Sequence, residues 1–308
     1  MEDSWKRARK ENALRVRAGM IRAIRRFFAK NDYLEVETPF RIPGPAPESH
    51  IDAIPSDDWF LHTSPELCMK RLLAAGYPQI FQLCKCFRRG ERGSLHIPEF
   101  TLLEWYKSGT DYRKMMEECE ELISHVARSL GHGRTLYYRG REIAIQAPWE
   151  RISVKDAFRR YSSVSPAEAL ENNLFDEIMV REIEPRLAER KTPVFLYDYP
   201  VVLGALARTK GSNPDVAERF ELYMGGLELA NAFSELTDAG EQRGRFEKEE
   251  QNRRESGKPP YPMPEKFLSE LATMPESSGI ALGVDRLAMI FTDSATIDDV
   301  VTFTPEEL

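Results

Sequence analysis

The chain has 308 residues, of which 42% are hydrophobic and 30% are charged. This length and composition suit one large globular domain or two ordinary ones, and they exclude a disordered or collagen-like chain. The formal net charge of -7 argues against a protein that wraps nucleic acid along its whole surface. Without a run of about 18 apolar residues, we expect no membrane span.

The four cysteines and five histidines show neither a disulfide framework nor a zinc motif. We expect free, buried thiols at Cys68, Cys84, Cys86 and Cys119. Cys84 and Cys86 are expected on one strand with their thiols on opposite faces, where they could not share a metal ion. The N-terminus lacks the apolar core of a signal peptide, so the sequence predicts a reducing, cytoplasmic location.

The first thirty residues are basic, with ten Lys or Arg residues and three acidic ones. Apolar residues recur among them at helical spacing: Leu14, Ala18, Ile21, Ile24 and Phe28. This pattern predicts a helix packed on the body of the protein, with its basic face in solvent or toward an acidic partner. A transit peptide is the alternative, although the pattern runs directly into a strand-like segment at 33–38.

Local patterns predict the following elements in chain order. The first half gives a proline-rich loop at 39–47, a strand near 59–62, a helix opening at 63–66 with Ser64 as its cap, strands at 79–88 and 99–106 joined by a charged loop, a helix at 111–130 and a hairpin at 137–145. The second half gives a polar helical segment at 150–192, strands at 194–199, 219–224, 227–236 and 279–282, and helices at 238–254 and 284–291.

Neighbouring strands joined by turns, with helices outside them, indicate an α+β fold with a mainly antiparallel sheet flanked by helices. We expect a single domain over residues 1–308, in which 150–192 forms a helical insertion. The sequence contains no Walker loop, no Gly-x-Gly-x-x-Gly after a strand and no nucleophile elbow or plausible triad. Instead, carboxylates and arginines gather on predicted strands in three groups.

The first group surrounds the loop between the strands at 79–88 and 99–106. Arg88 is suited to bind a phosphoryl group as a planar donor, and Phe100 offers a surface for a stacked base. Glu104 and Tyr106 share a strand face with Phe100, because each lies an even number of positions from it. A surface ion pair at the strand ends is the plainer alternative.

The second group flanks a predicted Gly-Gly turn. Glu221 and Glu228 lie on its two sides, where two carboxylates could converge on a divalent ion such as Mg²⁺. The second strand carries more candidate residues on one face: Asn231, Phe233 and Glu235. A solvated acidic face is the alternative, but the intervening residues are too apolar for an exposed strand.

The third group is a strand of small residues at 279–282 that runs into a helix bearing Arg286 in its first turn. Glycine would let a nucleotide approach the backbone closely, and Arg286 would meet a terminal phosphate. An ordinary helix cap formed by Asp285 and Arg286 is the alternative.

In this order and spacing, the three groups resemble motifs 2 and 3 of class II aminoacyl-tRNA synthetases, and LEVETP at 34–39 resembles motif 1, part of the dimer interface. Segments similar to the lysyl-tRNA synthetase subgroup are TSPEL at 63–67 with KRL at 70–72, PEF at 98–100 and ELANAFSEL at 228–236. The resemblance extends over nearly the whole chain. It implies a homodimeric ligase that uses ATP and Mg²⁺.

The resemblance also implies roles for the matching residues. On the nucleotide side these are Arg88 for the α-phosphate, His96 and Arg286 for the outer phosphates, Phe100 for stacking on adenine, Glu91 as a further ATP contact, and Glu221 and Glu228 for Mg²⁺. On the substrate side they are Glu66 for the amino group near the carboxyl end, Glu104, Tyr106 and Glu235 for the distal ammonium, and Asn231 and Phe233 along the pocket. Ala281 stands where synthetases usually have Gly, and its methyl could reshape the pocket toward a β-amino acid. The chain departs from the family pattern at Gly90, Leu95, Ile97 and Ala232.

Lysyl-tRNA synthetases carry an N-terminal OB-fold that reads the anticodon, and we expect none here, because the catalytic motifs begin near Met1. The sequence therefore resembles truncated paralogues in this family that activate (R)-β-lysine or lysine and transfer it to a lysine side chain of elongation factor P. One alternative is a minimal enzyme that charges tRNA, which the acidic net charge disfavours. The other is a regulatory paralogue without turnover, which the retained arginines and carboxylates disfavour.

Overall fold

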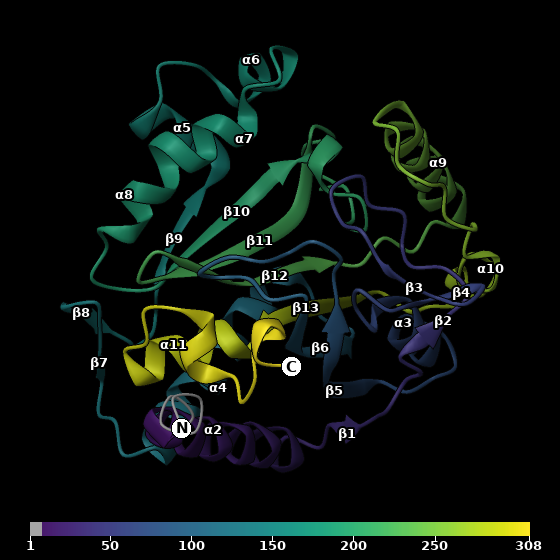
Figure 1. Ribbon diagram of the computed structural model, residues 1–308. Coiled ribbons are helices and arrows are strands. Elements are labelled where there is room, and N and C mark those ends of the chain that lie inside the picture. The colour runs from purple at the N-terminus through teal and green to yellow at the C-terminus, as the bar shows by residue number, and fades with distance from the viewer. Residues whose placement is uncertain (1–7) are drawn as a thin grey trace.

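An eight-stranded sheet organises residues 8–308, the part of the chain that this computed structural model describes (Figure 1). In spatial order its strands are β1 (Leu34–Glu35), β5 (Gln79–Phe87), β6 (Glu99–Ser108), β13 (Ser277–Gly283), β12 (Leu227–Ser234), β11 (Val216–Met224), β10 (Val194–Pro200) and β9 (Glu150–Ser153). Neighbours are antiparallel except in the two outermost pairs, β1 with β5 and β9 with β10. The predicted α+β fold with a mainly antiparallel sheet is confirmed.

One face of the sheet forms the main hydrophobic core under three helices: α2 (Glu11–Lys30), α4 (Tyr112–Ser129) and α11 (Val284–Thr292) (Figure 1). Alternate residues of the central strands, such as Leu103 and Trp105 of β6 and Ile280 of β13, are buried there. Helix α4 begins as predicted, because the Asp111 side chain accepts hydrogen bonds from two backbone N–H groups of the first turn. The opposite face is left for polar chemistry.

The N-terminal helix is confirmed from residue 8 onward, but its predicted apolar stripe is partly wrong. Ala18 is exposed, and Leu14 and Ile21 are half-buried. The face buried against α4 and the sheet consists of Met20, Ala23, Ile24, Phe27 and Phe28. The predicted stripe therefore coincides with the buried face only at Ile24 and Phe28, because that face is wider than one residue per turn. Residues 1–7 of the basic segment lie outside the described part.

The segment predicted as helical at 150–192 opens with a strand. Residues 150–153 form β9, which pairs parallel to β10 and buries Ile152. Helices follow as α5 (Val154–Tyr161), α6 (Pro166–Glu171), α7 (Phe175–Ile178), a π-helical turn η1 (Met179–Ile183) and α8 (Glu184–Ala188). They enclose a small core of their own around Phe158 and Phe175 at this end of the sheet.

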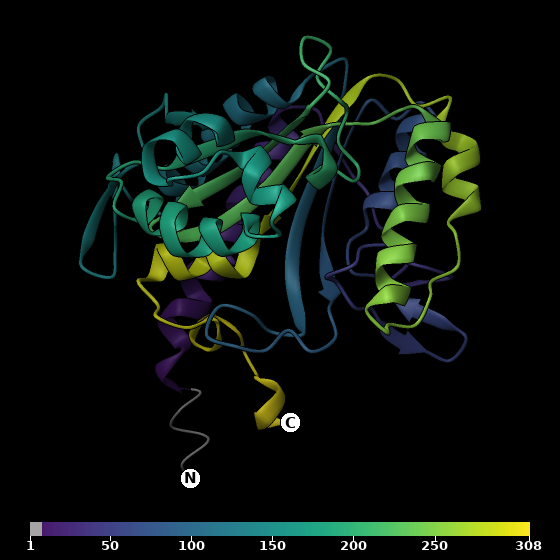
Figure 2. The ribbon, with the colours of Figure 1, turned by 90° about the horizontal axis from the view of Figure 1, so that it is seen from above.

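A second group of elements lies at the other end of the molecule (Figure 2). It comprises α3 (Glu66–Ala74), α9 (Ala239–Glu255), α10 (Glu265–Leu271) and a small sheet of β2 (Arg41–Ile42), β3 (Ile54–Ser56) and β4 (Trp59–Leu61). Sequence patterns missed α10. The charged helix α9 is held by a fully buried Arg253, whose guanidinium donates to the carbonyls of Glu48 and Ile51, both at 2.9 Å. This contact fixes the loop before β3 over the sheet.

Two predicted hairpins are confirmed. β7 (Thr135–Tyr138) pairs with β8 (Arg141–Ala144), and β11 turns into β12 through Gly225 and Gly226, which both adopt positive φ angles. Short turns complete the chain as η2 (Val201–Leu203), η3 (Ile297–Val300) and η4 (Pro305–Glu307). Within residues 8–308, no helix is both long and apolar enough to cross a membrane.

Candidate active site

The open face of the sheet carries a row of candidate side chains directly opposite one another. Glu104 of β6 pairs with Ala281 of β13, Ala281 with Asn231 of β12, and Asn231 with Glu221 of β11. Because side chains alternate along a strand, all four belong to the same face. Strand register thus brings residues from three distant segments into one line.

The next row on this face contains Tyr106, Gly279, Phe233 and Arg219, again as neighbours across the strands. Position 279 requires glycine, because the side chains of Tyr106 and Glu235 approach its backbone closely. A Cβ at this position would lie 2.3 Å from the Tyr106 ring and 2.5 Å from Oε1 of Glu235. The missing side chain lets the phenol and the carboxylate meet.

Glu104 is buried in a cluster of side chains that is called the ammonium pocket below. The cluster also contains Glu66, Tyr106, Phe233 and Glu235. Oε1 of Glu104 accepts a hydrogen bond from Ser64 Oγ at 2.5 Å, and its Oε2 accepts one from Tyr106 OH at 2.7 Å. Burial, followed by the charge of Glu66, raises the pKa of Glu104 to about 8. Ser64 also accepts the Glu66 backbone N–H at 3.0 Å, so the residue predicted to cap α3 serves the pocket as well.

Lys70 joins the pocket and was missed as a functional residue by sequence reasoning. Its ammonium lies 2.5 Å from Glu66 and 2.5 Å from Glu235, and its side chain is 1% exposed. The same ammonium lies 4.9 Å from the centre of the Phe233 ring. The spacing of Glu66 and Lys70, one helical turn apart, was the available signal.

Glu235 is a buried carboxylate with an open acceptor. Its Oε2 is paired with Lys70, whereas no described group forms a hydrogen bond with its Oε1. Burial raises the pKa of Glu235 to about 8, although Lys70 opposes that rise. A cationic group entering the pocket would therefore find an acceptor in place.

The predicted nucleotide residues line an adjoining cavity of about 330 Å³. Arg88 follows β5, and its guanidinium lies 5.0 Å from the centre of the Phe100 ring and 3.7 Å from Glu91. A planar cation and an aromatic ring thus form one wall. The Arg88 guanidinium is suited to bind a phosphate, and the Phe100 ring is suited to stack on a base.

Arg286 also lines this cavity and is held by three contacts. It donates to the carbonyls of Glu228 at 2.8 Å and Leu95 at 3.3 Å, and its third contact is with His96 Nε2 at 2.6 Å. His96 accepts that bond as a neutral ring, and burial and the Arg286 charge lower its pKa. His96 and Arg286, which the resemblance assigns to the outer phosphates, therefore lie in contact.

Asp285 does not cap α11 together with Arg286. Its buried carboxylate accepts Arg17 at 2.5 Å and the backbone N–H of Thr101 at 2.6 Å. These bonds fasten the start of α11 to α2 and β6. Asp285 thereby positions the neighbouring Arg286.

Glu221 and Glu228 lie near the Gly-Gly turn and differ in their surroundings. Glu221 is almost buried; its Oε2 accepts Tyr199 OH at 2.5 Å and Tyr223 OH at 2.8 Å, and its Oε1 accepts Arg219 at 2.6 Å. Glu228 keeps 42% of its side chain exposed. Burial of its carboxylate within the cavity and the charge of Glu221 raise the pKa of Glu228 to about 7. Oε2 of Glu228 forms a loose ion pair with Arg286 at 3.6 Å, and the remaining lone pairs of Glu228 and Glu221 fit a hard divalent cation.

Arg219 was not singled out from the sequence. It bridges Asn231 Oδ1 at 2.9 Å and Glu221 Oε1 at 2.6 Å, and its guanidinium lies 4.5 Å from the centre of the Tyr199 ring. The available signal was its position two residues before Glu221 on the same strand face. Arg219 orients both predicted site residues.

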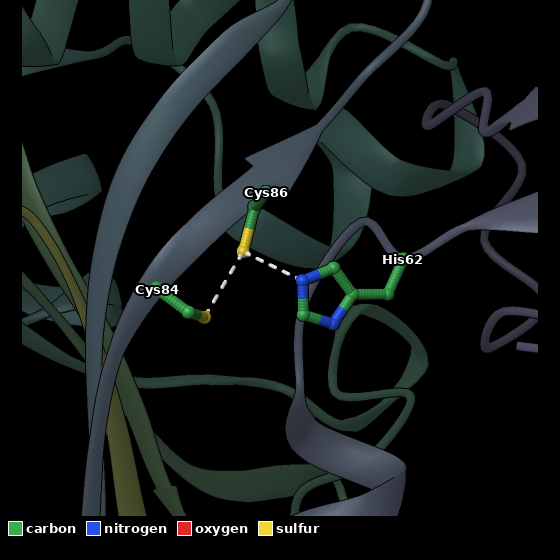
Figure 3. A group of neighbouring side chains, drawn as sticks. All are labelled: His62, Cys84 and Cys86. Carbon is green, nitrogen blue, oxygen red and sulfur yellow. Dashed lines mark hydrogen bonds between the residues drawn. The ribbon is translucent and has the colours of Figure 1, made fainter. Parts of the chain in front are cut away.

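The prediction that Cys84 and Cys86 point to opposite faces is wrong. Residues two apart on a strand share a face, and their sulfur atoms lie 3.9 Å from each other (Figure 3). His62 Nε2 lies 3.9 Å from Cys86 Sγ. The prediction that this pair could not share a metal ion fails for the same reason.

The predicted site residues thus fall into two adjoining regions. The nucleotide cavity contains Arg88, Glu91, His96, Phe100, Glu228, Asn231, Ala281 and Arg286. The ammonium pocket contains Glu66, Glu104, Tyr106, Phe233 and Glu235. Glu221 lines a neighbouring cavity together with Glu228.

Comparisons with known proteins identify the family of this chain. A family model described as tRNA synthetases class II (D, K and N) matches residues 3–307. A protein of Erwinia tasmaniensis named elongation factor P–(R)-β-lysine ligase is 37% identical, covering 98% of this chain and 97% of the relative. A Salmonella paratyphi B protein with the same name is 38% identical, covering 94% and 93%. The similarity spans nearly the full length of each relative.

Proposed function

This chain belongs to the class II tRNA synthetases (D, K and N), and from that membership we propose that it activates (R)-β-lysine or lysine with ATP and transfers it to a lysine side chain of elongation factor P. It is an ATP-dependent aminoacyl ligase. Relatives of nearly equal length that bear the ligase name support this acceptor.

The observation that carries the proposal is the charge of the ammonium pocket. The carboxylates of Glu66 and Glu235 contact the ammonium of Lys70, and the charge of Glu66 also acts on the buried carboxyl group of Glu104. When all three carboxylates are ionised, they and the single ammonium leave two net negative charges. Lysine and β-lysine each bring two ammonium groups, which match that charge. An aspartate side chain would instead place a further carboxylate among buried carboxylates, at a cost of several kcal/mol.

The first chemical step follows from the nucleotide cavity. The substrate carboxylate attacks the α-phosphorus of ATP in line, an acyl–phosphate bond forms, and pyrophosphate leaves. Arg88 and Arg286 both line this cavity, where they can stabilise negative charge on the phosphoryl oxygens. Neutral His96 keeps Arg286 in place. Positioning and charge therefore accomplish this step without a protein nucleophile.

Glu228 and Glu221 are the residues that would hold Mg²⁺. When bound, Mg²⁺ neutralises charge on phosphate oxygens. Tyr199, Tyr223 and Arg219 fix the Glu221 carboxylate, so one ligand is oriented before nucleotide binds.

The second step consumes the adenylate. A neutral lysine amine of the acceptor attacks the acyl carbon, the bond to the phosphate oxygen breaks, AMP leaves, and the proton of the amine passes to phosphate or solvent. A second cavity, of about 480 Å³, shares Glu48, Arg219 and Glu228 with the nucleotide cavity. It is lined in part by exposed Val180 and Val202, which gives the acceptor side chain an approach.

Three finer parts of the proposal concern the preferred amino acid, the oligomeric state and the location. Ala281 places a methyl group between Glu104 and Asn231, which favours the displaced amine of (R)-β-lysine over that of lysine. Leu34 is 49% exposed in the segment that resembles motif 1, which supports a homodimer through this edge. Because the proposed acceptor is a translation factor, we expect the reaction to take place in the cytoplasm.

ATP–pyrophosphate exchange tests the proposed substrate class. We expect exchange with (R)-β-lysine and lysine, and none with aspartate or asparagine. Glu104→Gln removes one charge while keeping the side-chain shape, and it should abolish exchange. Glu118→Gln is the matched control, because Glu118 lies on α4, outside the site, and burial also raises the pKa of its carboxyl group, which interacts with Tyr33. Exchange with aspartate, or an active Glu104→Gln variant, would refute the assignment.

A further inference from the structure

A cluster of two thiols and one imidazole lies beneath the nucleotide cavity, and the proposed reaction does not use it. Cys84 and Cys86 come from β5, and His62 follows β4 (Figure 3). All three are buried, with exposed fractions of 7%, 0% and 1%. One donor atom from each residue lies within 4.8 Å of the other two, the only such group of His, Cys, Asp and Glu donors in residues 8–308.

The spacing of these atoms fits a tetrahedral metal site. Two sulfur ligands at about 2.3 Å from a zinc ion are about 3.8 Å apart. The two sulfur atoms here are 3.9 Å apart, and His62 Nε2 is 3.9 Å from Cys86 Sγ. The donors of Cys84 and His62 lie within 4.8 Å of each other, so side-chain movements of about 1 Å would bring all three donors onto one ion.

The surroundings favour a divalent, thiophilic ion. Leu102, Phe100 and Ala281 pack against the cysteines, so little water reaches the sulfur atoms. Two thiolates in such surroundings need two positive charges nearby to be stable. A divalent ion with two thiolates and a neutral imidazole is electrically balanced, and this donor set suits zinc-like cations.

Two buried polar atoms beside the cluster have no hydrogen-bond partner among the described residues: His62 Nδ1 and Gln82 Oε1. Gln82 precedes Cys84 by two residues on the same strand face and is 2% exposed. Its free oxygen offers a fourth donor on the side of the cluster away from Cys86. His62 Nε2 now donates to the Lys85 carbonyl at 2.7 Å, a bond that coordination would replace.

We propose that His62, Cys84 and Cys86 bind one zinc-class divalent cation per chain. Phe100 packs on the thiols and also lines the nucleotide cavity. Occupancy of this site therefore also stiffens the wall against which the nucleotide lies.

Titration of the reduced, metal-free protein with Cd²⁺ tests the site. We expect thiolate-to-cadmium charge-transfer absorption that saturates at one ion per chain, and competition by Zn²⁺. Cys84→Ser and Cys86→Ser should each remove most of this absorption, and His62→Gln should weaken binding at least tenfold, about the loss seen when a supporting residue of a metal site is removed. Cys119→Ser is the matched control, because Cys119 is equally buried but lies on α4 in the other core.

Several results would overturn the proposal. The first is absence of the absorption in the wild-type protein. The second is absorption in the Cys84→Ser/Cys86→Ser variant equal to that of the wild type. The third is saturation of the wild-type protein at any ratio other than one ion per chain. A second readout guards against misfolded variants: Zn²⁺ should raise the melting temperature of the wild type and of Cys119→Ser, and leave that of folded Cys84→Ser unchanged. A stable Cys84–Cys86 disulfide in a protein that binds no metal when reduced would also refute the site.

Discussion

Gly279→Ala tests whether the ammonium pocket depends on close approach of its walls. The added Cβ would lie 2.3 Å from the Tyr106 ring and 2.5 Å from Glu235 Oε1, whereas ordinary contacts begin at 3.4 Å. Tyr106 and Glu235 must therefore retreat by about 1 Å. A displacement of that size at a positioning group costs about 100-fold in rate, or about 2.7 kcal/mol of transition-state stabilisation.

The assay is ATP–pyrophosphate exchange with (R)-β-lysine. We expect kcat/KM for the diamino acid to fall about 100-fold, with a KM for ATP close to that of the wild type, because the nucleotide cavity is separate. Gly244→Ala is the control, since a Cβ on that exposed helical glycine meets nothing within 4 Å. A folded Gly279→Ala protein with a kcat/KM within twofold of the wild type would refute this reasoning.

Three further predictions follow from the same geometry. Arg286→Ala should abolish ATP–pyrophosphate exchange, and undiminished exchange would contradict its role at the phosphates. Above pH 8, where Glu235 is ionised beside Lys70, Lys70→Met should lower the free energy of unfolding by about 3 to 5 kcal/mol, because it removes the cation that compensates this buried carboxylate; a loss below 1 kcal/mol in urea unfolding at that pH would argue against a buried ion pair. The KM for the diamino acid should fall as the pH rises from about 6.5 to 8.5, because Glu104 and Glu235, with pKa values near 8 in the free protein, must ionise to bind ammonium. A KM independent of pH over this range would exclude that linkage.

Much of the site was predictable from the sequence because it is built on strands. Alternation places Glu104 and Tyr106 on one face, and it places Asn231, Phe233 and Glu235 on another strand in the same way. Alternation along one strand cannot show which strands are neighbours. The resemblance to the class II synthetase motifs predicted that these strands adjoin in one sheet.

The parts that failed depend on contacts between distant segments. Lys70 has the pattern of an ordinary helical lysine until the fold brings its ammonium next to Glu235. Arg219 gains its role only when β11 and β12 pair in register. The error at Cys84 and Cys86 was of another kind, because residues two apart on a strand share a face and sequence alone sufficed to place them together.

The central claim is that the activated amino acid passes to a protein. Its most direct test offers purified elongation factor P and total tRNA side by side to this protein with ATP and labelled (R)-β-lysine or lysine. We expect label on elongation factor P, with (R)-β-lysine preferred. Label on tRNA, or adenylate formation with neither acceptor labelled, would contradict it.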